Sequence, residues 1–287
     1  MKVIVDIKAG LGNQLFCYAF GYAVAKKTGG SLIIDTSVLD RKRIKDRYLE
    51  ILKFDLPYKK RISFYYTYNP FLKKLKTNRI MKRLAIGLKT KIYKEENHLG
   101  FDKRVFEEKE NIYFDGYWQN YRYFDEYRKE LTEIIKLKEP DAIREFQDEI
   151  EKNNSVSIHI RRGDYVSVGW EIPMQYYLDA LELLKSKTTC SKLVAYVFSD
   201  DIDYAREFLE KSVGEDIIIK YMDYTNENKV VYDMYLMSCC KYNIIANSTY
   251  SWWAAYLSKN DDRIVICPET GTWNENFYLP EWIRIKV

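Results

Sequence analysis

The sequence predicts an α/β fold of two domains, each a parallel sheet with helices, that face each other across a cleft. Three observations predict it: the chain opens as strand, loop, helix and strand; its second half alternates strand-like runs with helical patterns; and a break near Glu139-Pro140 separates the two series. A length of 287 residues with 47% apolar content suits two ordinary domains. We therefore expect an N-terminal domain over residues 1–150 and a C-terminal domain over residues 151–287.

The N-terminal series begins with a buried strand at residues 3–7 and a glycine-bearing turn at 8–13. A helix with one apolar face follows at 15–27, and Gly29-Gly30 ends it. A second apolar run occupies 31–35. This order predicts a right-handed parallel crossover.

The C-terminal series contains strand-like runs alternating with amphipathic helical patterns, which predicts an open parallel sheet with helices on both faces. In such sheets ligands bind outside the carboxyl ends of the strands, so the residues after each strand are the first candidates for a site. The runs are 156–160, 193–198, 217–221, 243–246 and 264–267, and the helical patterns are 176–184, 204–211, 230–239 and 252–257.

Two arginines, Arg161 and Arg162, directly follow the first of these strands. Arginine presents a fixed fork of donors that matches phosphate oxygens and stays charged at any relevant pH. Such a fork stabilises the negative charge that develops on a diphosphate leaving group. The structural alternative is an ion pair between one arginine and Asp164.

His159 lies inside the same strand between two isoleucines, a setting more typical of a core histidine, so its case depends on its neighbours. Asp200 and Asp201 follow the next strand, and paired carboxylates suggest a divalent cation. No further acid is clustered with them in the sequence, however. A carboxylate also pairs with the N–H donors of a guanine edge, and we expect one of the two to cap the following helix. His98, in a polar loop, is expected at the surface.

Two polar loops complete the candidate site. The loop 247–251 precedes a helix, so its hydroxyl and N–H groups gather at a positive helix end that favours phosphate; its candidates are Asn247, Ser248, Thr249 and Ser251. The segment Gly10-Leu11-Gly12-Asn13-Gln14 also follows a strand, but it lacks the spacing of a dinucleotide fingerprint or a P-loop. Its glycines allow close backbone approach, and Asn13 and Gln14 are expected to reach into the cleft.

Composition excludes several classes of protein. The net charge of +4 is too small for a dedicated nucleic-acid binder. Five cysteines without regular spacing fit reduced thiols and no zinc site. We expect neither a signal peptide nor a transmembrane anchor, and hence a cytoplasmic location.

A basic segment from Phe71 to Lys94 contains no acidic residue and interleaves its charges with apolar residues. A helix of this kind suits the surface of an anionic membrane, which would make the protein peripheral at the inner face of the membrane. The alternative is a solvated helix that packs on its own domain.

Four segments together resemble the bacterial α-1,2-fucosyltransferases of glycosyltransferase family 11. They occur in the family's order and span nearly the whole chain. They are Gly10-Leu11-Gly12-Asn13-Gln14-Leu15-Phe16, His159-Ile160-Arg161-Arg162-Gly163-Asp164-Tyr165, Phe198-Ser199-Asp200-Asp201 and Ile245-Ala246-Asn247-Ser248-Thr249-Tyr250-Ser251-Trp252-Trp253.

The resemblance implies two Rossmann-like domains of the GT-B type, an acceptor-side N-terminal domain and a donor-binding C-terminal domain. It implies transfer of L-fucose from GDP-β-L-fucose, with inversion and no metal or other cofactor, to O2 of galactose in an oligosaccharide of surface polysaccharide or O-antigen synthesis. The acceptor would be lipid-linked if the basic segment touches a membrane. Another GDP-sugar as donor, or a non-catalytic protein that binds GDP or a glycan, remains an alternative.

The resemblance also assigns roles to the candidate residues. It places the diphosphate on Arg161 and Arg162, guanosine on His159 and Asp200 or Asp201, phosphate oxygens on Ser248, Thr249 and Ser251, and Asn13 and Gln14 in the opposite wall. Asp164 is the first candidate for the base that inversion requires; orienting an arginine is its alternative role. Ala9, Cys17 and Tyr242 depart from the family's usual glycine, glutamine and histidine.

Overall fold

The computed structural model describes residues 1–39, 48–63, 87, 89–189, 192–271, 273 and 276–287. It divides into two compact units, Met1–Lys136 and Leu137–Val287. The sequence placed the division near residue 150, which lies inside a helix of the second unit, α4 Arg144–Lys152. Each unit has its own parallel sheet, so the α/β class is confirmed. The facing arrangement across a cleft stays a prediction.

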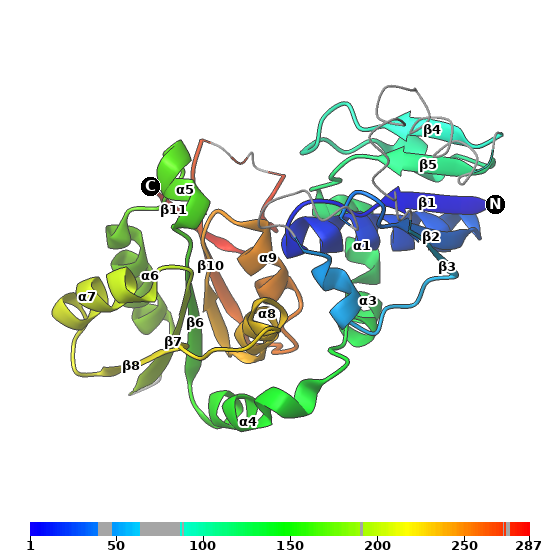
Figure 1. Cartoon of the computed structure of the whole chain (residues 1–287). Coiled ribbons are helices and arrows are strands. Elements are labelled where there is room, and N and C mark those ends of the chain that lie inside the picture. The colour runs from blue at the N-terminus through cyan, green and yellow to red at the C-terminus, as the bar shows by residue number, and fades with distance from the viewer. Residues whose placement is uncertain (40–47, 64–86, 88, 190–191, 272, 274–275) are drawn as a thin grey trace, which may run out of the picture. The chain divides into compact units, whose positions relative to one another are not determined.

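The sheet of the first unit has the strand order β3-β2-β1-β5-β4, and all its strands are parallel (Figure 1). The predicted opening of strand, helix and strand is confirmed. The strands are β1 Lys2–Asp6, β2 Ser31–Asp35, β3 Lys60–Ile62, β4 Lys91–Lys94 and β5 Ile112–Asp115, and the α-helices are α1 Leu11–Thr28 and α3 Arg128–Ile134.

Helix α1 is buried around most of its circumference, and not only along the one apolar face that the sequence predicted. It packs so closely on the sheet that a Cβ atom on Gly21 would lie 2.5 Å from a methyl carbon of Val5. The helix ends at Gly29, whose φ of 65° suits a residue without a Cβ atom. It begins at Leu11, four residues before the predicted start.

The sheet of the second unit has the order β11-β10-β9-β6-β7-β8, again fully parallel. All five predicted strands and all four predicted helices are present. The strands are β6 Ser155–Ile160, β7 Leu193–Ser199, β8 Ile217–Tyr221, β9 Tyr242–Ile244, β10 Ile264–Glu269 and β11 Ile283–Lys286. The remaining helices are α5 Gly163–Val168, α6 Met174–Lys187, α7 Ile202–Ser212, α8 Lys229–Cys239 and α9 Thr249–Tyr256.

Strand β6 lies at the centre of this sheet, and every one of its residues is buried. Apolar side chains of α6 and α7 form a core against it. The chain proceeds from β6 outward through β7 and β8, then returns to the other side of β6 with β9. The strand order therefore reverses between β6 and β9, which is where open α/β sheets bind their ligands.

Two sequence predictions concern residues at the limits of the described structure. Most of the basic segment lies outside the described residues, namely 71–86 and 88. The helix predicted for this segment does not extend to the end of the segment, because Lys91–Lys94 form strand β4. In the described ranges, no helix has the length and apolar character needed to cross a membrane. Four cysteines are free thiols, and Cys190 lies outside the described residues.

Candidate active site

Three polar loops meet at the carboxyl edge of the second sheet. They follow β6, β7 and β9, which are adjacent strands, and Ile160 at the end of β6 pairs with Ser199 at the end of β7. The prediction that these loops share one edge is confirmed. The edge includes the point where the strand order reverses.

The Arg161 guanidinium is held between two carboxylates. Its Nη2 lies 2.5 Å from Oδ1 of Asp164, and its Nη1 lies 2.5 Å from Oδ2 of Asp200. The Arg161 side chain is 28% exposed, so solvent or a ligand reaches it. The structural alternative for Asp164, an ion pair with one arginine, is thus present.

Arg162 is oriented by a different set of groups. Its Nε donates to Oδ2 of Asp201 at 3.0 Å, and its Nη1 donates to Oε2 of Glu171 at 3.1 Å. The centre of its guanidinium lies 3.4 Å from the centroid of the Tyr204 ring, a close cation–π contact. Sequence analysis missed Glu171 and Tyr204, which follow Arg162 too far along the chain to form a motif.

Asp200 and Asp201 serve mainly to hold the arginines. Oδ1 of Asp200 accepts the backbone N–H of Arg162 at 2.8 Å. Oδ1 of Asp201 accepts the backbone N–H of Tyr204 at 3.3 Å and so caps α7, which confirms the expected cap. Among the residues whose structure is described, no group of three or more His, Cys, Asp or Glu side chains could hold a metal ion.

His159 is buried in β6, and its Nδ1 has no hydrogen-bond partner within the described part of the chain. Burial, with a smaller contribution from the positive charge of Arg161, lowers the pKa of His159 to about 3. The imidazole is therefore neutral near pH 7. Its ring centroid lies 5.2 Å from that of Tyr250. His98 is exposed, as expected.

The loop after β9 leads into α9, which begins at Thr249, three residues before the predicted start. Oγ of Ser248 caps the helix by accepting the N–H of Tyr250 at 3.3 Å. Oδ1 of Asn247 and Oγ of Ser251 are buried and have no hydrogen-bond partner in the described ranges. Buried polar atoms normally have partners. The Ser251 hydroxyl can donate a hydrogen bond and lies at a positive helix end, so it fits an anionic ligand, whereas Oδ1 of Asn247 only accepts and suits a donor group. Thr249 is half-buried in the first turn.

A buried acid that sequence analysis did not identify, Asp233, lies on α8. It accepts hydrogen bonds from Tyr224 at 2.8 Å and from Lys229, whose Nζ lies 2.9 Å from its Oδ2. Burial raises the pKa of Asp233. The hydroxyl of Tyr250 donates to Val230 O at 2.6 Å and so links the beginnings of α8 and α9. The sequence signal that could have identified Asp233 is its position as a single acid among the apolar residues of a predicted helix.

The remaining candidates, Asn13 and Gln14, belong to the first unit. Gln14 is fully buried: its Nε2 donates to Ala9 O at 2.9 Å and to Tyr48 O at 2.8 Å, and its Oε1 accepts the N–H of Ile51 at 3.0 Å. Oδ1 of Asn13 accepts a hydrogen bond from Gln119 at 2.5 Å. Ala9, which replaces the family's usual glycine, has a φ of 61°. That region favours glycine.

Comparison with known proteins decides the family. The model of Glycosyl transferase family 11 matches residues 2–286. The chain belongs to this family. It is 34% identical to an Escherichia coli alpha-1,2-colitosyltransferase over 302 residues, covering 99% of each chain. It is 30% identical to the Escherichia coli O-antigen biosynthesis glycosyltransferase WbnK, covering 97% of this chain and 99% of that protein.

Solved structures of fucosyltransferases share the fold of this family 11 glycosyltransferase. The fucosyltransferase NodZ from Bradyrhizobium matches with a TM-score of 0.53 and 15% identity, covering 88% of this chain and 91% of NodZ. A mutant of Arabidopsis thaliana FUT1 in complex with GDP matches with a TM-score of 0.54 and 14% identity, covering 94% of this chain and 71% of that one. At such low identity the similarity concerns the fold.

Proposed function

We propose that this glycosyltransferase transfers L-fucose from GDP-β-L-fucose to a hydroxyl of a glycan, O2 of galactose, with inversion and without a metal ion. The observation that carries the proposal is the pairing of two oriented arginines with the unsatisfied Ser251 hydroxyl at the start of α9, on one edge of the sheet. Arginine forks and a helix N-terminus both favour a diphosphate.

In this proposal the arginines stabilise the departing GDP. Arg161 is the more exposed arginine of the pair, at 28% against 19% for the Arg162 side chain. A diphosphate would approach the exposed part of the Arg161 guanidinium while Asp164 holds one side of it. Asp200 would continue to hold its other side. Arg162, stacked on Tyr204, adds positive charge that cannot be lost by deprotonation. Stabilisation of this kind accelerates a displacement that develops charge on the leaving group.

The roles of the other predicted residues follow from their surroundings. His159 offers guanosine a neutral, unpaired nitrogen. Asp200 and Asp201, which the resemblance assigned to guanosine, already bond the arginines, so we assign them to positioning Arg161 and Arg162. Ser248, Thr249 and Ser251 receive phosphate oxygens at the start of α9, whereas the Oδ1 acceptor of Asn247 suits a donor group of the substrate. Asn13 stays a candidate contact from the first unit, whereas Gln14 has no donor left for a substrate.

One relative, the colitosyltransferase at 34% identity, supports colitose as an alternative to L-fucose as the transferred sugar. Colitose differs from L-fucose by the absence of one ring hydroxyl, so the same diphosphate and guanosine contacts would serve either sugar. The name of WbnK supports an acceptor from O-antigen synthesis. Transfer from GDP-fucose and from GDP-colitose to galactose-terminated oligosaccharides should therefore be compared in one assay.

The test of the proposal is transfer by wild type and Arg161→Ala in the presence of a chelator. We expect wild type to transfer fucose without added metal, and Arg161→Ala to lose about 10²–10³-fold in kcat, as for other donors that stabilise developing charge. Arg144→Ala, which removes an exposed arginine paired with Asp141, is the matched control. Activity lost in chelator alone, or unchanged in Arg161→Ala, would contradict the proposal. GDP binding without transfer would favour a binding protein.

A further inference from the structure

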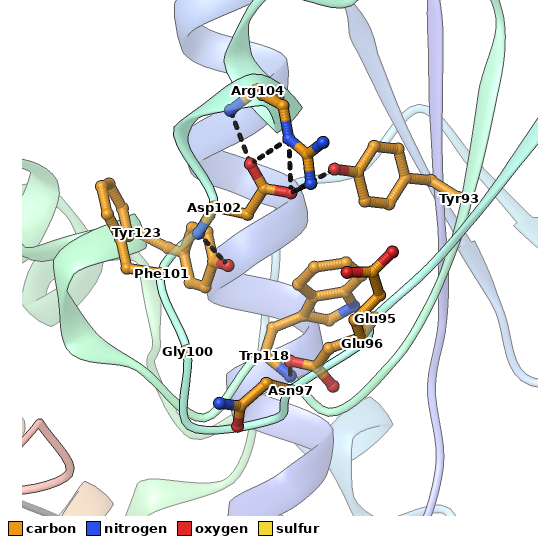
Figure 2. A pocket seen from close by; sticks show the side chains of 10 residues that line it. All are labelled: Tyr93, Glu95, Glu96, Asn97, Gly100, Phe101, Asp102, Arg104, Trp118 and Tyr123. Carbon is orange, nitrogen blue, oxygen red and sulfur yellow. Dashed lines mark hydrogen bonds and ion pairs between the residues drawn. The ribbon is translucent and has the colours of Figure 1, made fainter.

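A cavity of about 280 Å³ lies in the first unit, at the carboxyl ends of β4 and β5 (Figure 2). Its lining includes neither Arg161 nor Arg162, and no residue of the loop 247–251 before α9. Figure 2 shows the Trp118 indole within it, with the Asp102–Arg104 ion pair at one end and Asn97 at the other. The lining residues are Tyr93, Glu95, Glu96, Asn97, Gly100, Phe101, Asp102, Arg104, Trp118 and Tyr123.

The loop after β5 is built around one half-buried carboxylate of this cavity. Glu95 accepts the N–H of Tyr117 at 2.6 Å and the N–H of Trp118 at 2.8 Å. A Cβ atom on Gly116 would lie 2.5 Å from Cβ of Glu95, so only glycine fits there. Burial raises the pKa of Glu95. These contacts fix the position of the loop relative to β4.

Trp118 adopts a φ of 56°, which is rare for a bulky residue. Such conformations cost free energy and persist where surrounding contacts impose them, often at ligand sites. Here the imposed conformation places an indole in the wall of a cavity. Phe20 stacks on that indole with ring centroids 4.0 Å apart and fixes it from the core side.

The wall combines aromatic surface with carboxylate acceptors. Tyr93, Phe101 and Tyr123 supply ring surface, and the guanidinium of Arg122 lies 4.4 Å from the Phe101 ring centroid. Glu96 is exposed and makes no hydrogen bond to a described residue, so its carboxylate is available to accept from a ligand. Aromatic faces with such acceptors suit a ring that carries several hydroxyl donors.

The charge and size of the cavity narrow the ligand further. Asp102 neutralises the one lining arginine, Arg104, which leaves the carboxylates of Glu95 and Glu96 and disfavours a phosphate. The volume lies just below the roughly 300–1,000 Å³ typical of small-molecule sites, and the cavity is therefore too small for a nucleotide sugar. We infer that this cavity binds one neutral hexose ring of the acceptor glycan, a role that rests on the proposed transferase activity.

The test compares acceptor and donor kinetics in two variants of the full chain. Glu96→Gln and Phe101→Leu should each raise the acceptor KM at least fivefold for a galactose-terminated oligosaccharide such as lactose. The GDP-fucose KM and the rate of GDP-fucose hydrolysis without acceptor should stay within twofold of wild type. Glu110→Gln, at an exposed position before β5, and Phe106→Leu, which replaces a neighbouring ring outside the lining, are the matched controls.

A direct binding measurement separates this inference from the proposed function. Saturation-transfer NMR with lactose on wild type should show contact with the sugar, and Glu96→Gln and Phe101→Leu should weaken it while thermal melting confirms that both variants are folded. An unchanged acceptor KM and undiminished lactose contact in both variants would overturn the inference even if transfer is observed. Absence of transfer by wild type with all donors and acceptors would instead remove the proposed function.

Discussion

The carboxylate of Asp200 lies directly against the backbone of Gly163, where a Cβ atom would meet its Oδ2 at 2.5 Å. That carboxylate cannot move aside freely, because Oδ2 also pairs with Arg161 and Oδ1 accepts the N–H of Arg162. Gly163, the first residue of α5, thus allows the acid that orients Arg161 to lie close to the backbone.

Substitution of Gly163→Ala should impair catalysis through Arg161 without unfolding the chain. The added methyl group displaces the Asp200 carboxylate and with it the guanidinium, and misplacement by about 1 Å costs on the order of 100-fold in rate. We expect that loss in kcat/KM for transfer, measured with GDP-fucose. Gly271→Ala, where a Cβ atom meets nothing within 4 Å, should retain wild-type kcat/KM. Equal activity of the two variants would refute the argument.

Asp164 should act by orienting Arg161 rather than as the catalytic base, because its carboxylate already pairs with that guanidinium. Asp164→Asn should then reduce kcat about tenfold, below the ~10²–10⁴-fold typical of losing a general base. The pH profile of kcat should keep its acidic limb. A much larger loss together with a vanished acidic limb would identify Asp164 as the base.

His159 should make the fold less stable in mild acid. The unfolded chain takes up a proton near the ordinary histidine pKa of 6.5, whereas the folded chain does not until about pH 3. The unfolded state therefore binds more protons in this window, and stability falls as pH drops. Between pH 7.5 and 5.5, wild type should lose about 1.4 kcal/mol more unfolding free energy than His159→Phe.

Urea denaturation at the two pH values measures this difference. His98→Gln provides the control, because His98 is the other histidine of the chain and is exposed. It should show the same pH dependence as wild type. Parallel curves for wild type and His159→Phe would show that the buried imidazole does not resist protonation.

Gln14 should contribute to stability rather than to donor binding. Gln14→Ala leaves the carbonyls of Ala9 and Tyr48 and the N–H of Ile51 without their side-chain partner, at a cost of about 1–3 kcal/mol for each group that stays buried and unsatisfied. We expect a lower urea midpoint with GDP affinity within twofold of wild type. Weaker GDP binding at an unchanged midpoint would support a substrate-binding role for Gln14 in the cleft wall, where the resemblance placed it.

Most of the second sheet and the strands β1 and β2 of the first could be predicted from the sequence, because buried parallel strands are continuous apolar runs and the helices between them repeat their apolar residues every three to four positions. The strands β3, β4 and β5 were not predicted. The predicted starts of α1 and α9 were late by three or four residues, since short polar residues and glycine resemble a loop when the first turn of a helix begins with them. Strand order could not be predicted, because pairing depends on contacts between distant segments.

Part of the candidate site could also be predicted, because several of its residues directly follow strands that the sequence predicts. Arg161, Asp200 and Asn247 follow strands, and parallel strands bring their carboxyl ends to one edge. Glu171 and Asp233 lie in or before helices, where the same residue types usually face solvent, so no local pattern marked them. The cavity of the first unit joins Glu95, Phe101 and Trp118 from segments that carry no shared motif.

The sequence by itself determined the α/β class, the family and the placement of two arginines at the end of a buried strand, because strand periodicity and short motifs are local properties. Only the tertiary structure decided which groups those arginines pair with, that Asp201 caps α7 while Asp200 lies against Gly163, and that Gln14 is buried with its hydrogen bonds complete. Pairing, burial and cavity shape depend on side chains that are far apart in the chain and meet only when it folds.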